Sequence, residues 1–498
     1  MNLYIRNHRL VCLLVLLILI TGGCQKYLVE KDSSNFIKSS YFASPSQAQT
    51  FVNGIYNQLH MFQNGDAYGE APFITLELYA GHATSLGQSV NNNNVIFERS
   101  DAVNPGYEDI WQNSYNGIAN ANLALANIPK VSMDSLTRKS LLGEVYFLRA
   151  FFYYNLARLY GDVPLITNAV TVSSPDLYPV RTPYAQVYAL IISDLQAAES
   201  AGLPETDQTG RVSLGAVRTL LASVYLTTAG YPQQVTANYA LAAAEAQKVL
   251  PDYTLFTQYL FLHDNPHKNL GELIFQDQYK VGFATNAIPN LTVPFQLPVG
   301  NYGGGLGAMI PTNQFVNSYE PGDLRTQERQ FYFSTYPNFT DTTKTVIFGE
   351  HCLYKYFQLE SALGNGQSDE NWTYLRLPEA MLIYAEASNE VNGPTPGAYL
   401  QVNKIRERAL LPDLTGLTKD QFRIAIWKER YHELAYENKA YFDIQRTHMI
   451  YDVVNNIFGD AFSTPNEQGV VIKHQYLLWP VPQREINTNK KLTQNTGW

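Results

Sequence analysis

The stretch that decides the fold is EVYFLRAFFYYNLARLYGDVPL, residues 144–165. Apolar side chains recur through residues 141–159 at spacings of three and four, the period of one face of an α-helix. Further aromatic residues widen this stripe until the helix is apolar nearly all round, so we expect it to be buried. Gly161 and Pro164 end the predicted helix.

Helical periodicity continues on both sides of this segment. Residues 46–61, 214–228 and 239–250 each carry apolar side chains at helical spacing. The pattern Tyr239, Ala243, Ala246, Leu250, Pro251 resembles the second helix of a tetratricopeptide repeat, whose small side chains let a neighbouring helix approach closely. Helix pairs around residues 110–160, 183–230, 237–250 with 374–390, and 397–437 could be four degenerate repeats.

Two long stretches lack this pattern. Residues 63–105 are predicted as a loop, and residues 252–372 collect Pro, Gly, Asn and Tyr between short strands at 272–277 and 345–348. Long loops inside a compact domain are often functional. Near the end, residues 470–478 alternate as a last strand or an extended segment. Because helical pattern flanks the middle region, we do not expect it to form a separate domain.

The first 24 residues are typical of a secretion signal. Positive residues precede an apolar run from Leu10 to Ile20, which is shorter than the roughly 20 residues of a membrane-spanning helix. The following Thr-Gly-Gly-Cys, residues 21–24, resembles a bacterial lipobox. We predict that residues 1–23 are removed, that Cys24 is acylated, and that residues 24–40 form a tether. Ordinary secretion with a chance cysteine is the alternative.

Composition excludes several classes of protein. The chain has 498 residues, with 35 Lys and Arg against 44 Asp and Glu, so its net charge of −9 does not suit a nucleic-acid binder. Aromatic residues make up 13% of the chain, which excludes a disordered protein. Once the leader is removed and Cys24 is acylated, Cys352 remains as a lone thiol, and no internal disulfide can form.

Three glutamates could be read as catalytic acids. Glu429, Glu433 and Glu437 are spaced four apart on a predicted helix, and paired carboxylates are the machinery of a glycoside hydrolase. Lys and Arg side chains surround them, however, so a charged helix face bonded to its neighbours is the preferred interpretation. On the buried helix, Arg149 and Arg158 are likewise expected to pair with buried carboxylates.

The sequence gives little support for a metal site or a catalytic cysteine. His432-Glu433 begins like a zinc-protease motif, but Tyr436 occupies the place of the second histidine. Cys352 follows His351 directly, and a catalytic Cys/His pair needs a geometry that sequence neighbours rarely give, so a buried structural cysteine is expected. We therefore expect no catalytic residue, no metal and no cofactor.

The loop-rich stretches hold the candidate ligand-binding residues. A sugar presents apolar C–H faces, on which aromatic rings stack, and edge hydroxyls, which side chains such as Asn and His satisfy. Because these stretches lack a helical period, we expect their side chains to be free of packing and to meet on one face. The candidates are Tyr68, Tyr79, His82, Asn91, Asn93 and Tyr107 in the first stretch, and Tyr279, Tyr302, Tyr336 and Trp372 in the second.

Several blocks together resemble the SusD/RagB family of outer-membrane lipoproteins. They are IWQNSYNGI at 110–118 followed by Ala121-Asn122, the opening stretch at 144–165, RLPEAMLIYAEASNE at 376–390, VNKIRERALLPDL at 402–414, KERYHELAYENKAYFDIQR at 428–446, and the closing LLWPVPQREINTNKKLTQNTGW at 477–498. The blocks come in the family's order and, with the lipobox, span the chain.

This resemblance implies a mainly α fold. About four tetratricopeptide-like helix pairs would form a right-handed superhelix, with long loops and a few short strands on one face. Residues 41–498 would form one SusD-like domain, with an N-terminal part at about 41–250 and a C-terminal RagB/SusD part at about 270–498. Charged residues of the blocks would form buried or interhelical salt bridges: Glu144, Arg149, Arg376, Glu379, Glu386, Arg406, Glu429, Arg430 and Glu433.

The resemblance also implies a function and a partner. Family members are cell-surface lipoproteins that capture nutrients, usually oligosaccharides, without cleaving them. A SusC-like TonB-dependent outer-membrane transporter is the implied partner, with the lipoprotein as its hinged lid. A surface glycoside hydrolase and a binder of another nutrient, such as peptide, are the alternatives.

Overall fold

The computed structural model describes residues 42–62, 70–86, 89–170, 174, 177–293, 299–300 and 305–498. The predicted leader and the tether with Cys24 lie outside these residues, and so do the candidate residues Tyr68 and Tyr302. Every structural statement below concerns the described part of the chain.

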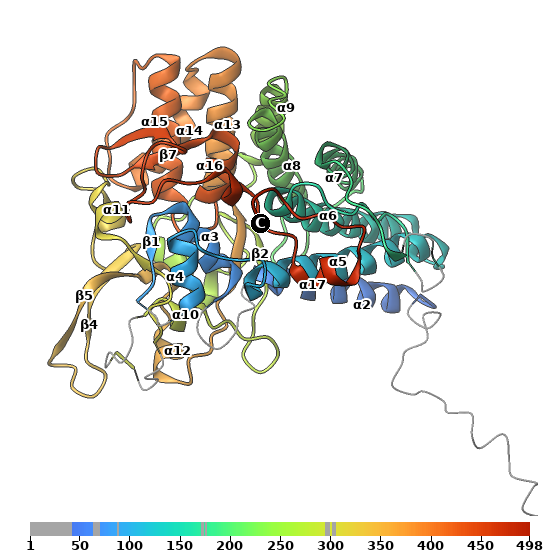
Figure 1. Cartoon of the computed structure of the whole chain (residues 1–498), viewed down its shortest axis with the longest axis horizontal. Coiled ribbons are helices and arrows are strands. Elements are labelled where there is room, and N and C mark those ends of the chain that lie inside the picture. Colours follow the sequence, from blue (N-terminus) through green and yellow to red (C-terminus); the bar gives the residue numbers. More distant parts are fainter. Residues whose placement is uncertain are drawn as a thin grey trace, which may run out of the picture.

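Pairs of neighbouring helices form the scaffold (Figure 1). They are α5 (Pro105–Asn127) with α6 (Ser135–Tyr160), α7 (Tyr184–Glu199) with α8 (Leu214–Ala229), α9 (Asn238–Val249) with α13 (Leu377–Asn392), and α14 (Pro396–Arg408) with α15 (Lys419–Glu433). Successive pairs pack on each other, because α6 contacts α7, α8 contacts α9, and α13 contacts α14. The predicted helix pairs are confirmed, including the third, whose two helices come from distant parts of the chain.

Helix α6 contains the stretch that decides the fold. It begins after Asp134, whose side chain accepts a hydrogen bond from the Thr137 N–H at 2.9 Å, and it ends before Gly161, which has a φ of 72°. Its C-terminal half is buried nearly all round, as predicted. A Cβ atom on Gly117 of α5 would collide with the Phe152 ring of α6, so this glycine allows the two helices to approach.

The prediction of a loop over residues 63–105 is wrong for much of this stretch. Its described part contains α3 (Pro72–Ala80) and α4 (Val90–Ile96). Every residue of α3 is buried, and Gly81 ends the helix in the left-handed region with a φ of 87°. The α3 sequence PFITLELYA is mainly apolar, and its polar residues Thr75 and Glu77 are buried with the rest, so the sequence shows no amphipathic stripe from which a helix could be recognised.

Strands occur as two-stranded antiparallel pairs in the described residues. They are β1 (Ala83–Thr84) with β3 (Ile310–Pro311), β2 (Leu273–Asp277) with β6 (Trp372–Arg376), β4 (Tyr332–Pro337) with β5 (Thr345–Leu353), and β7 (Met449–Asp452) with β8 (Ile457–Asp460). The two strands predicted in the middle region are confirmed as β2 and as part of β5. Residues 470–478 are not a strand, since 3₁₀ helix η10 (His474–Leu477) occupies the second half.

Short helices complete the chain. They are α2 (Pro45–Tyr56), η3 (Asn57–Phe62), η4 (Ile128–Lys130), η6 (Tyr259–Leu262), η7 (Asn265–His267), α10 (Ile288–Leu291), α11 (Asn313–Asn317), η8 (Leu324–Thr326), η9 (Tyr354–Tyr356), α12 (Leu359–Leu363), α16 (Ala440–Thr447) and α17 (Gln483–Thr488). Helices α2 and η3 together account for the first predicted helix.

The helix pairs and the loop-rich elements occupy different parts of the molecule. In Figure 1 the helix pairs lie along the top and the right, whereas α10, α12 and the β4–β5 hairpin lie at the lower left. One continuous hydrophobic core contains residues from Ala48 to Leu492, so both halves of the chain contribute to it. The loop-rich elements are therefore attached to a firmly packed scaffold.

Candidate functional site

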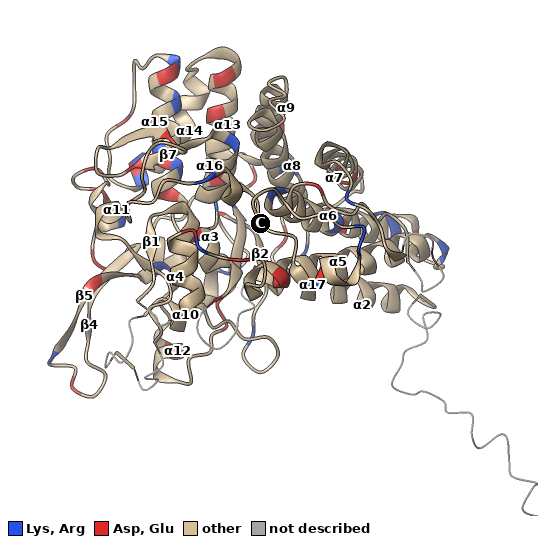
Figure 2. Cartoon of the chain, in the orientation of Figure 1, with Lys and Arg blue, Asp and Glu red and all other residues tan. Residues whose placement is uncertain are grey.

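The two loop-rich stretches meet, as predicted from the sequence. Strand β1 pairs with β3 through Ala83 opposite Pro311, and the Leu86 N–H donates to the Gly307 carbonyl at 2.7 Å. We call the exposed residues of α4, α10, α12, the 278–293 segment and the β4–β5 hairpin the loop surface. Figure 2 shows few charged residues around α10 and α12, in contrast to the many along α13 and α15.

Five of the predicted ligand-binding residues are buried. Tyr79, His82, Tyr107, Tyr279 and Trp372 are each at most 6% exposed. They offer little surface to a ligand in this structure, so the expectation that loop side chains are free of packing is wrong for them. Tyr79, Tyr107 and Trp372 lie on α3, α5 and β6, while His82 directly precedes β1 and Tyr279 lies just after β2, so all five side chains enter the core.

The five buried candidates make hydrogen bonds and ring contacts with other residues of the core. The hydroxyl groups of Tyr79 and Tyr107 lie 2.5 Å apart, and His82 Nε2 lies 2.8 Å from a carboxylate oxygen of Glu77. The Trp372 ring stacks on Tyr356 at 5.7 Å between centroids with an interplanar angle of 18°. The two tyrosine hydroxyls and His82 Nε2 thus have partners, as burial of polar atoms requires, whereas His82 Nδ1 is buried without a hydrogen bond.

Three predicted residues do keep exposed surface. Asn93 on α4 is exposed, and Asn91 is half-buried with its amide donating to Glu70 at 2.7 Å. Tyr336 on β4 is half-buried, and the Arg329 guanidinium lies 5.1 Å from the centroid of its ring. These side chains belong to the loop surface.

The sequence analysis missed Phe283. Its side chain is 89% exposed, more than any other large apolar residue in the described part of the chain. It stands in a turn closed by a hydrogen bond of 2.7 Å from the Lys280 N–H to the Ala284 carbonyl, and Gly282 supplies a φ of 89°. The candidate rings were tyrosine, tryptophan and histidine, so this phenylalanine, which directly follows a glycine, was not among them.

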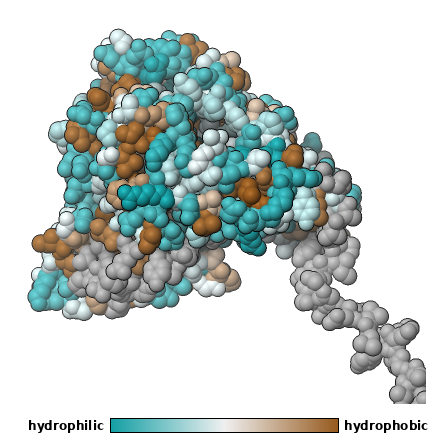
Figure 3. Space-filling view, viewed as in Figure 1, coloured by the Kyte–Doolittle hydropathy of each residue, from teal (hydrophilic) through white to brown (hydrophobic). Residues whose placement is uncertain are grey.

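Apolar residues do not form one broad face in the view of Figure 3. That face is mostly hydrophilic, with apolar residues in separate small patches, one of them over the β4–β5 hairpin. Ile347 of β5 is 75% exposed and belongs to this hairpin. Separate exposed rings and apolar patches suit the binding of a partly polar ligand better than the binding of a lipid surface.

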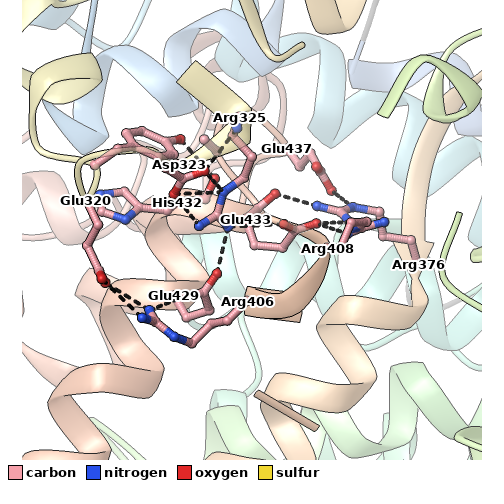
Figure 4. Close-up of polar contacts among 12 residues, drawn as sticks. Glu320, Asp323, Arg325, Arg376, Arg406, Arg408, Glu429, His432, Glu433 and Glu437 are labelled. Carbon is pink, nitrogen blue, oxygen red and sulfur yellow. Dashed lines mark hydrogen bonds and ion pairs between the residues drawn. The ribbon is translucent and has the colours of Figure 1, made fainter. Parts of the chain in front are cut away.

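The three glutamates considered as catalytic acids belong to a buried ion-pair network (Figure 4). Arg376 donates to Glu433 at 2.6 Å and to Glu437 at 2.7 Å, while Arg325 donates to Glu429 at 2.6 Å. All three carboxylates are buried and point at arginines of neighbouring elements. The interpretation of these glutamates as a charged helix face bonded to its neighbours is confirmed. All three carboxylates form ion pairs with arginines of neighbouring elements and are buried in this structure.

The arginines also set the charge of the network. Burial alone would raise the pKa of Glu433, but Arg408, Arg376 and Arg325 outweigh it and lower this pKa to about 2. Burial also opposes ionisation of Glu437, whose pKa is nevertheless lowered by Arg376 and Lys355. Both groups are therefore ionised at neutral pH. Burial raises the pKa of Glu429, although Arg325 and Arg406 oppose the shift.

The salt bridges predicted for the signature blocks are confirmed. Further pairs are Glu144 with Arg211, Arg149 with Asp194, Glu379 with Lys439, Glu386 with Arg446, Arg406 with Glu320, and Arg430 with Asp443.

The prediction for Arg158 is wrong, since it makes no ion pair with any described residue. Its guanidinium lies instead between the rings of Tyr154 and Phe442, at 3.9 and 3.6 Å from their centroids.

The remaining chemical candidates are packed in the core. His432 is buried, its Nε2 lies 3.0 Å from Ser318 Oγ, and its ring stacks on Tyr319 at 4.0 Å. Cys352 is fully buried, and burial raises the pKa of its thiol.

In the described part of the chain, no group of three or more His, Cys, Asp and Glu side chains is placed to hold a metal ion. Nor does any helix there combine the length and apolarity needed to cross a membrane.

Two family models match this chain. Residues 330–498 match the model described as the SusD family. Residues 26–226 match the model described as starch-binding and associating with the outer membrane. The two matches lie in the C-terminal and N-terminal parts that the signature blocks mark.

Relatives and solved structures agree with these models. The crystal structure of a SusD superfamily protein from Parabacteroides distasonis is 34% identical with a TM-score of 0.88, covering 91% of this chain and 99% of that chain. SusD-like protein P2 of Formosa agariphila is 28% identical over 97% of this chain and 98% of its own length. Surface glycan-binding protein A from Bacteroides thetaiotaomicron, solved in complex with laminarihexaose, has a TM-score of 0.73 at 21% identity, covering 90% and 99%.

The first of these structures shares the fold of this chain at 34% identity, whereas the last supports the fold alone. The chain belongs to the SusD family. The resemblance found in the signature blocks is confirmed, and so is the mainly helical fold that it implied.

Proposed function

We propose that this chain is a lipid-anchored glycan-binding protein of the outer membrane, which captures oligosaccharides and delivers them to a SusC-like TonB-dependent transporter. Family membership supports the proposal, since one matching model is described as starch-binding and associating with the outer membrane. The observation on this chain that carries it is the loop surface, where Phe283 and Tyr336 keep aromatic surface outside the core.

The proposed ligand contacts follow from the chemistry of this surface. The rings of Phe283 and Tyr336 would stack on the C–H faces of sugars, each for about 1 kcal/mol by analogy with aromatic pairs. Arg329, Asn91 and Asn93 would satisfy hydroxyl groups. Tyr68 and Tyr302 remain proposed contacts that lie outside the described residues, whereas the buried candidates would support the surface from below.

Binding without cleavage is part of the proposal. The acids spaced along α15 and beyond it are occupied by arginine partners, which supports a binder over the alternative glycoside hydrolase. The experiment is calorimetry of the purified chain against a broad panel of oligosaccharides, with chromatography of each mixture afterwards. We expect at least one glycan to bind and every glycan to keep its length. Reproducible shortening of any glycan would favour the hydrolase, and binding of peptides alone would favour another nutrient.

The anchor is proposed at Cys24. Intact-mass analysis of membrane-extracted protein should give a chain that starts at Cys24 and carries lipid. A Cys24→Ser variant should lose the lipid, whereas a Cys12→Ser variant, altered within the predicted leader, should keep it. A soluble product of the unaltered gene, cleaved elsewhere, would contradict this part of the proposal.

Delivery requires a partner, because an acyl anchor moves nothing across a membrane. Purification from detergent-solubilised outer membranes should bring down a barrel of the TonB-dependent class. A purely structural adhesin would be recovered alone, and its deletion would leave growth on the bound glycan unchanged.

A further inference from the structure

A cavity lies away from the loop surface. It has a volume of about 460 Å³ and opens between α6, α7, α8, α16 and the C-terminal segment, near the end of the chain marked in Figure 1. This volume falls within the roughly 300–1,000 Å³ of small-ligand pockets. None of the residues that line it belongs to the loop surface or to the predicted site.

Aromatic rings form much of its wall. Tyr184, Tyr188, Tyr231, Phe442, His448 and His474 all line the cavity. Tyr231 and His448 stack face to face, with ring centroids 3.8 Å apart and an interplanar angle of 10°, and Tyr231 is 39% exposed. Flat faces of this kind are suited to the C–H face of a ring ligand.

Arg158 faces this cavity without a carboxylate partner. It makes no ion pair with a described residue, its Nε is buried without a hydrogen bond, and Nη2 donates to Asn155 Oδ1 at 2.6 Å. Glu379 lines a separate inner cavity of about 40 Å³ with Arg158, but Glu379 is paired with Lys439 at 2.7 Å. The positive charge of Arg158 is therefore left for another acceptor.

Arg181 lines the same cavity and is also without an ion pair in the described residues. It donates to the carbonyl oxygens of Asp162 at 2.7 Å, Thr493 at 2.8 Å and Tyr160 at 3.1 Å, and to Asn495 Oδ1 at 2.5 Å. These acceptors are neutral, so they fix the position of the guanidinium without cancelling its charge. The side chain of Asp162, which accepts from the Tyr184 N–H at 2.8 Å, is the acid that lines this cavity.

The charges around the cavity leave an excess of one positive unit. The third arginine of the lining, Arg446, is balanced by Glu386 and by Asp443, which it shares with Arg430. What remains is two guanidinium groups, Arg158 and Arg181, against the one carboxylate of Asp162. In a chain with a net charge of −9, most arginines are paired, so a cationic cavity is a departure from the rest of the molecule.

We propose that this cavity binds an acidic sugar, a pyranose ring that carries one carboxylate. The guanidinium groups of Arg158 and Arg181 take the carboxylate, the stacked ring of Tyr231 takes the C–H face, and Asp162 with the tyrosine hydroxyls takes the ring hydroxyls. One carboxylate balances the excess charge. The cavity is separate from the loop surface, so this proposal can be tested independently of glycan binding at the loop surface.

The test is calorimetry of the full chain with sodium glucuronate, sodium galacturonate, glucose and cyclohexanecarboxylate. Glucose has the sugar ring without the charge, and cyclohexanecarboxylate has the charge and a ring without hydroxyls. We expect at least one uronate to bind tenfold or more tightly than both controls. Arg158→Gln and Tyr231→Ala should each weaken that binding at least tenfold, whereas Arg99→Gln, on an exposed arginine beside Phe97, should not.

Tyr231 is partly exposed, so its variant keeps the test decisive if Arg158→Gln fails to fold. No detectable uronate binding overturns the proposal. Equal binding of cyclohexanecarboxylate overturns the assignment to a sugar, and an unchanged affinity in Tyr231→Ala overturns the assignment to this cavity. Binding of neutral oligosaccharides should be unaffected by Arg158→Gln, which separates this site from the loop surface.

Discussion

Arg149 of α6 donates hydrogen bonds from Nε and Nη2 to the two carboxylate oxygens of Asp194 on α7, at 2.7 and 2.8 Å. Its Nη1 donates to Asn122 of α5 at 2.8 Å, and all three side chains are buried. The ion pair thus joins the first helix pair to the second.

Replacing Asp194 by alanine should lower the free energy of unfolding by about 3–5 kcal/mol, because the Arg149 charge would stay buried without its partner. Chemical denaturation followed by circular dichroism measures this loss. Asp252→Ala, on an exposed aspartate, is the matched control and should change stability by no more than about 0.5 kcal/mol. Equal stability of the two variants would contradict the role given to the ion pair.

Phe283→Ala and Tyr336→Ala test the loop surface. Phe283 is 89% exposed, so its removal should change the melting temperature little, whereas Tyr336 also packs on Phe357 and its removal should lower the melting temperature modestly. At least one variant should bind its glycan tenfold or more weakly by calorimetry. Leu136→Ala, a 77% exposed residue at the start of α6, is the control and should bind normally. If both ring variants bind normally, the ligand lies elsewhere on the molecule.

Trp372→Ala should act on stability and not selectively on binding. The ring is 2% exposed and packs against Tyr356 and Phe73, so its removal leaves a cavity that costs about 3–5 kcal/mol. Thermal and chemical denaturation should both show the loss. A variant of unchanged stability that no longer binds glycan would return Trp372 to the list of ligand contacts.

Stability should also depend on the protonation of Glu98. Burial raises its pKa from 4.5 to about 7, although the nearby Lys473 opposes the shift. Because the folded-state pKa lies above the unfolded one, the contribution to stability is fully present below about pH 4.5 and is lost as the pH rises through about 7. Protonated Glu98 should therefore contribute to the free energy of unfolding at pH 5, and this contribution should be lost at pH 8.

Glu98→Gln removes this titration. The difference in melting temperature between pH 5 and pH 8 should shrink in this variant, since glutamine stays neutral at both values. Glu407→Gln, on an exposed residue of α14, should keep the full difference of the unaltered protein. A Glu98 variant whose pH profile overlays that of the Glu407 variant would show that Glu98 does not titrate in this range.

Much of the scaffold could be predicted from the sequence, because long helices such as α6 repeat apolar residues at spacings of three and four over several turns, and the signature blocks carry recognisable charged residues. Helix α3 could not, since its nine residues are mainly apolar, all of them are buried, and they show no helical period. The misassignment of Tyr79 follows directly from this, because a residue placed on a loop was in fact on a buried helix. Side-chain exposure depends on tertiary packing, so Phe283 could not be separated from the buried aromatic residues by composition.

The environment of Arg158 was beyond the sequence for a related reason. Its position on a buried helix predicted a carboxylate partner, yet its neighbours are the rings of Tyr154, one turn away, and Phe442, from a distant helix. The cavity that it faces is assembled from elements spread between α6 and the C-terminus. A cavity lined by so many separate segments cannot be predicted from a local sequence pattern.

The pairing of α9 with α13 bears on how such proteins diversify. These two helices are neighbours in space, although residues 250–376 separate them in the sequence. The loop-rich middle region therefore leaves the helical array and returns to it at a single pair, as an excursion between two fixed ends. Segments within it can lengthen, shorten or change composition at little cost in chain-closure entropy, while every helix keeps its place. Under the proposed function, ligand-binding segments of the middle region could change while the helices that carry them stay the same.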